Sequence, residues 1–322
     1  GELLKGAPNG WVMEYYVGKD YSLGGITLLC RFDGQRVTMA SQMSEADETV
    51  SSLYSVKSEQ ATMLSFDTYN YLVHYFGQPQ GSMSDDPNGT LGGDYEFIIS
   101  SASAERIELK GKKYGNRIVM KALTEDQTWK QYLTKIKKVE DDAFFYEYDL
   151  LMDGLYTGQM IRSNYTFIVT YYDEIGKVHQ KTVPFMFTAD GLRFHEPVTI
   201  DGQTMQNFVW KNELISFVCT DEGATGVKLA GVYTAGYQSY DYYPGTYQMD
   251  FYRLNDETGQ LEVASQEVRL LKNEDGKSYW LKGLEYDILV MYDKPRGGLS
   301  VSPQLLKKVQ GGYVYLAMWD VM

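Results

Sequence analysis

The chain has 322 residues with 30 basic and 43 acidic side chains, which gives a formal net charge of −13. At about 100–200 residues per domain, this length predicts two domains or one large β structure with a full hydrophobic core. The negative charge repels a phosphate backbone, so we expect no nucleic-acid partner. The apolar runs are far shorter than the roughly 20 residues that a membrane-spanning helix needs, so we expect no such helix.

Alternation of apolar and polar residues at period two indicates β-strands through most of the chain. Residues 26–32 and 165–171 are two examples, and both are rich in aromatic and β-branched side chains. Short turns separate these runs, and each places Asp or Asn close to Gly, which is the chemistry of a β-hairpin. Four such turns are residues 33–34, 173–176, 255–259 and 293–297.

One segment, residues 124–140, has the period of a helix. It opens with Thr124 and Gln127 in the S/T-x-x-E/Q spacing of a capping box. Its apolar residues then fall on one stripe: Trp129, Tyr132, Leu133, Ile136 and Val139. We expect this helix to cover a barrel mouth or to join two β units.

The sequence therefore predicts a mostly β protein built of antiparallel hairpin meanders in two β domains with one connecting or capping helix. Residues 1–123 are the first domain, a β-barrel or β-meander. Residues 124–141 are the helix and linker, and residues 142–322 are the second β domain.

Two cysteines and three histidines offer little to metal binding or to nucleophilic catalysis. Cys30 and Cys219 lie outside any CxxC spacing, and whether they pair stays open. His74, His179 and His195 form neither an HExxH motif nor a two-histidine helical face for zinc. No serine lies in a GxSxG elbow, and no glycine-rich stretch has a phosphate-binding layout. We expect no catalytic residue, no metal ligand and no cofactor.

Paired carboxylates are the enzymatic alternative that stays open. An acidic β protein offers many Asp and Glu pairs, and the separation of roughly 5–9.5 Å that defines a glycosidase pair is not visible in a sequence. Residues 84–90 with Asp94 resemble a calcium loop in composition, but the ligand spacing of an EF-hand is missing. We interpret this segment as a solvated loop.

The densest aromatic cluster is residues 237–247, which hold five tyrosines. Tyrosine covers apolar area at little cost in entropy while its hydroxyl bonds water or a ligand, and the CH faces of sugar rings stack on such rings. The simpler interpretation is that these tyrosines cover a face or edge of a β-sheet. The candidate binding residues are Tyr237, Tyr240, Asp241, Tyr242, Tyr243 and Tyr247.

Several segments resemble a domain-of-unknown-function family of Bacteroidetes cell-envelope lipoproteins: residues 9–16, 32–41, 64–70, 92–97 and 107–116. The opening Gly10-Trp11 is also loosely similar to the start of a lipocalin-type barrel, although the intervening residue of that motif is absent. The resemblance implies export, an N-terminal lipid anchor and a place among outer-membrane nutrient-acquisition proteins. It supplies no catalytic residue.

Our leading hypothesis is a non-enzymatic, outer-membrane-anchored lipoprotein that binds a glycan, a peptide or a partner subunit of an uptake system. In a small barrel the ligand would lie in the interior or at the mouth. The alternatives are a glycoside hydrolase with paired carboxylates and a purely structural scaffold lipoprotein, which would carry an exposed apolar patch.

Overall fold

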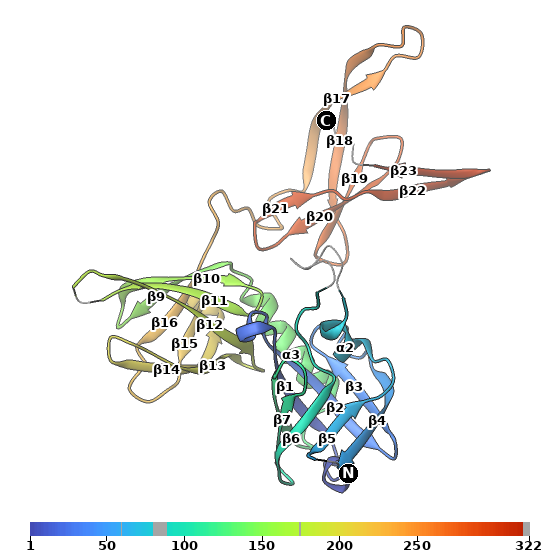
Figure 1. The fold of residues 1–322 in the computed structure, drawn as a ribbon. Coiled ribbons are helices and arrows are strands. Elements are labelled where there is room, and N and C mark those ends of the chain that lie inside the picture. The colour runs from blue at the N-terminus through green and yellow to red at the C-terminus, as the bar shows by residue number, and fades with distance from the viewer. Residues whose placement is uncertain (59, 80–88, 174, 318–322) are drawn as a thin grey trace. The chain divides into compact units, whose positions relative to one another are not determined.

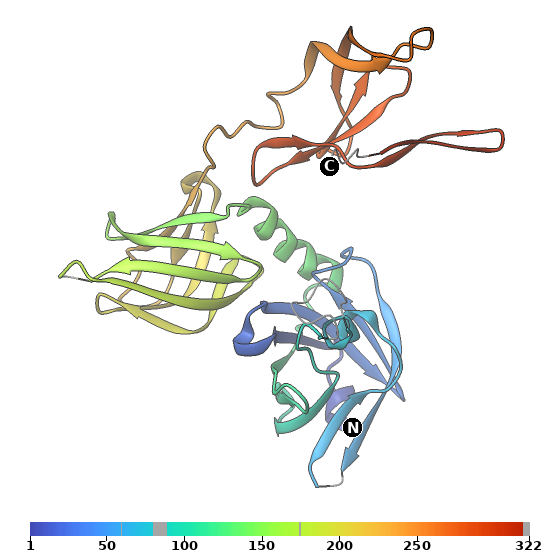
Figure 2. The same cartoon turned by 45° about the horizontal axis from the view of Figure 1, so that its top comes forward.

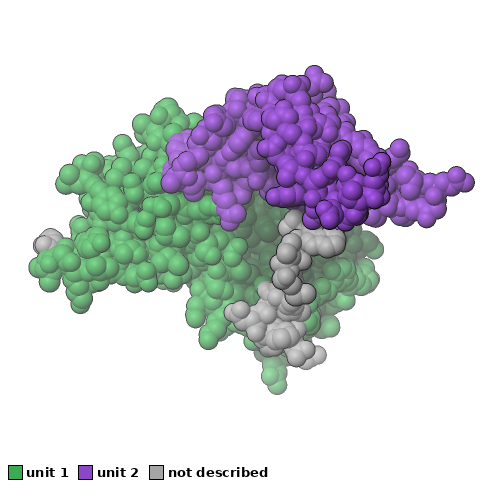
Figure 3. Space-filling model, turned by 90° about the horizontal axis from the view of Figure 1, so that it is seen from above, with its two compact units in different colours: residues 1–232 green, residues 233–322 purple. Residues whose placement is uncertain are grey.

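The computed structural model describes residues 1–58, 60–79, 89–173 and 175–317. It divides the chain into two compact units, residues 1–232 and residues 233–322, which Figure 3 colours separately. Unit 1 holds two closed barrels, and unit 2 holds an open sheet and a separate hairpin (Figure 1). The described strands pair in antiparallel fashion, so the predicted fold class is confirmed.

Barrel 1 is an eight-stranded meander in which each strand pairs with the next and β8 closes onto β1. Its strands are β1 (Trp11–Val17), β2 (Gly24–Asp33), β3 (Arg36–Ser41), β4 (Val50–Ser58), β5 (Thr62–Phe66), β6 (Glu96–Ala102), β7 (Arg106–Gly111) and β8 (Arg117–Ala122). The short helix α1 (Glu2–Lys5) precedes β1, and the 3-10 turn η1 (Lys19–Tyr21) follows it. Between β5 and β6 lie α2 (Tyr71–His74) and the 3-10 turn η2 (Tyr75–Gly77).

Large side chains fill the interior of barrel 1. Alternate residues of β1, including Trp11, Met13 and Tyr15, point inward and are fully buried, as the period-two pattern of a strand requires. The indole N–H of Trp11 donates to the carbonyl of Leu4 in α1 at 2.8 Å. The other face of β1 is buried too, because helix α3 and the second barrel cover it.

The predicted helix is α3 (Trp129–Asp142), but its predicted cap is wrong. Thr128, not Thr124, caps the helix and forms a reciprocal capping box with Gln131. The carbonyls of Thr124 and Gln127 instead accept hydrogen bonds from the side-chain amide of Asn9, both at 2.8 Å. This contact holds the segment before Thr128 as a loop.

Helix α3 lies between the two barrels (Figures 1 and 2), and its predicted apolar stripe contacts both. Leu133 packs with Val12 and Leu29 on the outer wall of barrel 1. Ile136 and Val139 join the core cluster of barrel 2. Because one helix buries side chains against both barrels, residues 1–232 form one compact unit. This grouping differs from the predicted division at residues 124–141.

Barrel 2 repeats the meander, with β16 closing onto β9. Its strands are β9 (Glu147–Met152), β10 (Leu155–Ser163), β11 (Thr166–Tyr172), β12 (Val178–Phe187), β13 (Gly191–Ile200), β14 (Gln203–Lys211), β15 (Ser216–Cys219) and β16 (Val227–Val232), with η4 (Asn212–Leu214) after β14. Aromatic rings fill its interior. Phe167 and Phe185, for example, are buried and stack with centroids 4.4 Å apart.

The two cysteines are free, buried thiols in different barrels. Cys30 belongs to the core of barrel 1 and Cys219 to the core of barrel 2. Burial raises the pKa of the Cys30 thiol well above its ordinary value, and it raises that of Cys219 to about 11. The open question of their pairing is therefore answered: no disulfide joins them.

Unit 2 holds a sheet in the order β17 (Gly245–Leu254), β18 (Leu261–Lys272), β19 (Ser278–Lys282), β20 (Ile288–Asp293) and β21 (Gly298–Ser300). A separate hairpin pairs β22 (Gln304–Val309) with β23 (Gly312–Leu316). The core of the unit is small, with Leu270, Tyr279 and Val290 buried at its centre. The far half of the β17–β18 hairpin extends beyond the strands that cover its base (Figure 1).

In the part of the chain that the structure describes, no helix is both long and apolar enough to cross a membrane.

Candidate functional site

Two of the predicted tyrosines help to build the core of unit 2. Tyr240 stacks on Tyr279 with centroids 4.7 Å apart, and its hydroxyl donates to the carbonyl of Ser278 at 2.7 Å. The hydroxyl of Tyr243 donates to the carbonyl of Gly297 at 2.7 Å. Both rings pack on the small core. These contacts match the simpler interpretation of the tyrosine cluster, in which the rings cover a sheet.

The other predicted binding residues are more varied. Tyr237 is half-buried and accepts a hydrogen bond from the hydroxyl of Tyr292 at 3.0 Å. Asp241 is exposed and pairs with Lys272. Tyr242 and Tyr247 are 61% and 44% exposed. The structure therefore leaves Asp241, Tyr242 and Tyr247 accessible to a ligand, and a role for them stays a prediction.

The carboxylates that come closest to the enzyme hypothesis are Glu147 and Asp149 on β9. They point outward from barrel 2, because Tyr148 and Leu150 between and beside them are buried in its core. Partial burial and the charge of Glu147 raise the pKa of Asp149. The pair lies on the outer wall of the barrel, and the glycoside hydrolase stays an untested alternative.

The predicted loop at residues 84–90 lies mostly outside the described residues, but Asp94 is described. Its buried carboxylate accepts backbone N–H groups of Lys113 and Tyr114 at 2.8 and 3.0 Å and the side-chain amide of Asn116 at 2.8 Å. These bonds occupy both of its oxygens in tying the β7–β8 turn to the barrel. Within the ranges that the structure describes, no group of three or more His, Cys, Asp or Glu side chains is placed to hold a metal.

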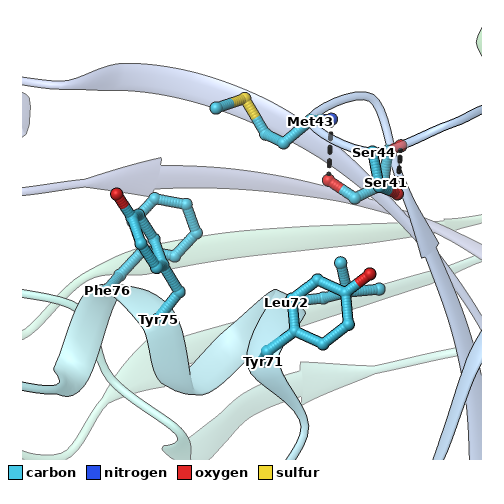
Figure 4. Close-up of a pocket in the computed structure, with 7 residues that line it drawn as sticks. All are labelled: Ser41, Met43, Ser44, Tyr71, Leu72, Tyr75 and Phe76. Carbon is cyan, nitrogen blue, oxygen red and sulfur yellow. Dashed lines mark hydrogen bonds between the residues drawn. The ribbon is translucent and has the colours of Figure 1, made fainter. Parts of the chain in front are cut away.

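Side chains fill both barrel interiors, and unit 1 has hollows on its outside. One site, which we call the aromatic groove, lies beside α2 and has a volume of about 300 Å³. Figure 4 shows its lining. The residues are Ser41, Met43, Ser44, Tyr71, Leu72, Tyr75 and Phe76.

The floor of the aromatic groove is apolar and its rim is mixed. Leu72 and Phe76 are buried, whereas Tyr75 and Met43 are 41% and 54% exposed. Met43 projects from the turn after β3, opposite the ring of Tyr75 (Figure 4). On the Met43 side Ser44 adds a hydroxyl, whereas the hydroxyl of the buried Ser41 accepts the backbone N–H of Met43 at 3.0 Å. The groove thus offers ring faces together with polar groups, as small-ligand sites do.

Local sequence explains why α2 presents these rings. Asn70 caps the helix by accepting the backbone N–H of Leu72 at 3.2 Å. Its side-chain amide also donates to the hydroxyl of Ser52 on β4 at 3.1 Å. Asn70 is fully buried, so it fixes the start of α2 against the barrel. The hydroxyl of Tyr71 donates to Glu48, which holds that ring at the rim.

A second site, the inter-barrel cleft, has a volume of about 680 Å³. Its walls come from barrel 1, from the loop before α3, from α3 itself and from barrel 2. Three of its lining residues form an ion triad, in which the Glu14 carboxylate contacts Lys121 Nζ at 2.8 Å and Arg193 Nη2 at 2.6 Å. The side chains of Glu14 and Arg193 are 12% and 24% exposed, so their ion pair is largely shielded from water, whereas Lys121 is 41% exposed.

Within this triad, the pKa values of Glu14 and Arg193 are shifted. Burial acts to raise the pKa of Glu14, but hydrogen bonds and charges from Arg193 and Lys121 outweigh it, and the pKa is lowered. Burial acts to lower the pKa of Arg193, and Glu14 more than offsets this. Glu14 and Arg193 are therefore both charged near neutral pH.

Close packing beside the cleft joins the barrels directly. A Cβ added to Gly25 on β2 would lie 2.9 Å from the Cβ of Met186 on β12. The rings of Tyr16 and Tyr21 contact His195 with centroid distances of 4.2 and 4.4 Å. The cleft is thus bordered by a tight interface.

Sequence reasoning missed both sites. The aromatic groove had a usable signal, because a capping Asn is followed by aromatic residues 71, 75 and 76. The inter-barrel cleft had none, because its charged residues lie on strands far apart in the sequence and meet only when the barrels pack.

Comparison with known proteins gives two family matches. A model described as a domain of unknown function (DUF4302) matches residues 1–212, and another domain of unknown function (DUF4987) matches residues 220–322. The comparison with curated proteins returned no match. A solved structure of a functionally unknown protein from Desulfotomaculum acetoxidans aligns with 90% of this chain and 68% of its own at 8% identity. Its TM-score of 0.11 is too low to carry any argument.

Proposed function

The chain belongs to the DUF4302 family, and we propose that it is a non-enzymatic cell-envelope lipoprotein, of the Bacteroidetes type, that binds a glycan in nutrient acquisition. The ligand-binding site in this proposal is the aromatic groove. The proposed likeness to a lipocalin is limited to the strand order of barrel 1. It does not extend to the place of the ligand, which in this proposal binds outside the filled barrel.

The observation that carries the proposal is the pairing of an exposed ring, Tyr75, and a half-buried ring, Tyr71, with a serine hydroxyl in the aromatic groove. Tyr71 and Tyr75 border a hollow of about 300 Å³, and the half-buried Ser44 supplies a hydroxyl oxygen on its other side. A sugar ring has an apolar CH face and a rim of hydroxyls, so it complements both kinds of surface. Tyrosine suits this task because its rigid ring loses little entropy on binding.

The test is a glycan-array screen of the full chain followed by titration calorimetry with each hit. We expect Tyr75→Ala to weaken binding about tenfold, as the loss of a central aromatic contact does. Tyr242→Ala, an exposed tyrosine of unit 2, is the matched control and leaves this binding unchanged. If the array gives no hit, or if Tyr242→Ala alone weakens binding, the assignment to the groove fails.

The envelope location is tested separately. Membrane fractionation and metabolic labelling with a palmitate analogue of cells that express the native gene should place the protein in the outer membrane with a lipid attached. A protein found only in the cytoplasm would contradict this part of the proposal and leave the binding test unaffected.

A second candidate function, docking on a partner protein of an uptake system, is favoured by the tip of the β17–β18 hairpin. Tyr252 pairs with Val263 and Leu254 with Leu261 on one face, and these four side chains are 58–74% exposed. An exposed apolar patch of this kind is typical of a protein interface. Photo-crosslinking from position 254 in cells would detect the partner, and position 248 on the same strand is the control.

A further inference from the structure

We propose that the inter-barrel cleft is a binding site for a small organic carboxylate with an apolar body. This site is separate from the aromatic groove, and the inference does not depend on the proposed function. It rests on the charge of the cleft, on one unsatisfied hydroxyl and on the shape of its walls.

The charge of the cleft opposes that of the chain. Its lining holds three cations, Lys121, Lys135 and Arg193, but only two carboxylates, Glu14 and Asp190. The chain as a whole has 43 acidic and 30 basic residues. Against this acidic background, a hollow with excess positive charge favours an anionic occupant.

The amino groups of the two lysines have donors to spare. Lys121 Nζ donates to Glu14 at 2.8 Å, and Lys135 Nζ donates to Gln127 at 3.4 Å. Each ammonium has three N–H donors, so both can also bond an incoming carboxylate. Such charge-assisted bonds are the strong ones, and Glu14 holds Lys121 in place for them.

A buried hydroxyl in the cleft lacks a partner. Thr27 on β2 lies opposite Glu14 on β1 in the strand register and lines the cleft. Its side chain is 1% exposed, and its Oγ1 makes no hydrogen bond in the structure. A buried hydroxyl without a partner costs free energy, and a ligand oxygen would remove that cost.

Apolar side chains from both barrels form much of the remaining walls, beside the polar residues Thr124, Gln127 and Thr188. Val12 and Leu123 face the cleft from barrel 1 and the loop after it, Tyr132 faces it from α3, and Met186 faces it from β12. The volume of about 680 Å³ lies within the usual range for a small-molecule site. These walls would hold the apolar body of the ligand, whereas the lysines and Thr27 would hold its carboxylate.

The experiment uses the full chain and two acid–alcohol pairs as probes. Octanoate and 4-phenylbutyrate are titrated by calorimetry at low ionic strength beside octanol and 4-phenylbutanol. We expect saturable binding of at least one acid, at least about tenfold tighter than its alcohol, and weaker at high salt. Bound acid should also raise the melting temperature, because the walls come from both barrels.

Three variants locate the site. Lys135→Met should weaken binding of the acid about tenfold, and Thr27→Val should weaken it to a smaller extent. Lys138→Met is the matched control, because Lys138 lies on the same helix and pairs with Asp142 away from the cleft. Circular dichroism melts without probe confirm that each variant is folded. The proposal is overturned if neither acid binds saturably, if acid and alcohol bind equally, or if folded Lys135→Met binds like the unchanged protein.

Discussion

Glu14 on β1 and Arg193 on β13 form an ion pair of 2.6 Å that joins the two barrels of unit 1. The Glu14 side chain is 12% exposed and that of Arg193 is 24% exposed. Taking such charges out of water is costly, so the pair need not add net stability over an apolar contact. Removing one partner does lower stability, because the remaining charge is then unpaired at a position shielded from water.

We expect Glu14→Gln to destabilise the protein by about 2–3 kcal/mol, less than for a fully buried pair because Lys121 reaches solvent. The substitution keeps the volume of the side chain and removes its charge, so Arg193 loses its counter-ion. The free energy of unfolding is measured by chemical denaturation at pH 7.

The control for this prediction is Glu96→Gln, which removes an ion pair of 3.0 Å with Lys112 at the surface of barrel 1. Exposed ion pairs contribute little to stability, so we expect the free energy of unfolding to change by no more than about 0.5 kcal/mol. A double-mutant cycle of Glu14→Gln and Arg193→Met then isolates the coupling. Equal small effects at Glu14 and Glu96 would show that the inter-barrel pair does not act as a clamp.

The second prediction concerns Gly24, which lies at the same interface between the barrels. Its φ is +71°, and an added Cβ would overlap the carbonyl oxygen of Tyr165 in barrel 2. Gly24→Ala therefore adds both backbone strain and a clash with backbone, and we expect a loss of about 3 kcal/mol or more. Thermal and chemical denaturation of the variant measure it.

Gly34 is the matched control for Gly24. It has a φ of +56° in the β2–β3 turn, and an added Cβ there would meet nothing within 4 Å. Gly34→Ala thus carries the backbone strain alone, about 1 kcal/mol. If the two variants lose the same stability, the close approach of β2 to Tyr165 does not hold in solution.

Much of the fold could be predicted because its signals are local. The turn at Gly34 and the stripe of Leu133, Ile136 and Val139 depend on neighbours within a few residues, and the structure has both. The closure of β8 onto β1 and of β16 onto β9 pairs strands far apart in the chain. Period-two alternation does not specify such partners, so the second barrel was not predicted as a separate element.

The sites were harder to predict than the strands. The cluster at residues 237–247 is conspicuous in the sequence, yet Tyr240 and Tyr243 use their hydroxyls on backbone carbonyls. The inter-barrel cleft is inconspicuous because Glu14, Thr27 and Arg193 are each flanked by apolar residues, and Arg193 lies far from the other two in the sequence. Such residues acquire a shared environment only when two barrels and a helix pack together.

The next prediction concerns the dependence of stability on pH through His195. Its ring packs against Tyr16 and Tyr21, and burial lowers its pKa below the ordinary 6.5. The unfolded chain therefore binds a proton at His195 at a higher pH than the folded protein does. The stability contributed by neutral His195 is fully present above about pH 6.5 and is lost as the pH falls through the folded value.

The check is the melting temperature between pH 7.5 and 5.5 for the unchanged protein and for His195→Phe, which keeps a ring against the two tyrosines. We expect a downward trend toward pH 5.5 that is shallower in the variant. His74→Phe, which changes a histidine of barrel 1 that stacks on Tyr95, should keep the steeper trend. Parallel curves for all three proteins would rule out His195 as the source.

The last prediction separates the structural tyrosines of unit 2 from the accessible ones. Tyr243→Phe removes the hydrogen bond of 2.7 Å to the carbonyl of the buried Gly297. That carbonyl keeps only the backbone N–H of Gln238 at 3.3 Å, so the change should cost about 1 kcal/mol of stability. Tyr242→Phe changes a hydroxyl on a side chain that is 61% exposed, so it should change stability by less than about 0.5 kcal/mol. Hydrogen exchange of the peptide spanning β20 and β21, followed by mass spectrometry on the full chain, reports the opening of unit 2 alone. We expect faster exchange in Tyr243→Phe only, because the Tyr243 hydroxyl is bonded to the turn between these strands.

Equal exchange in both variants would mean that the Tyr243 hydroxyl makes no such bond in solution. Tyr243 would then return to the set of residues available to a ligand.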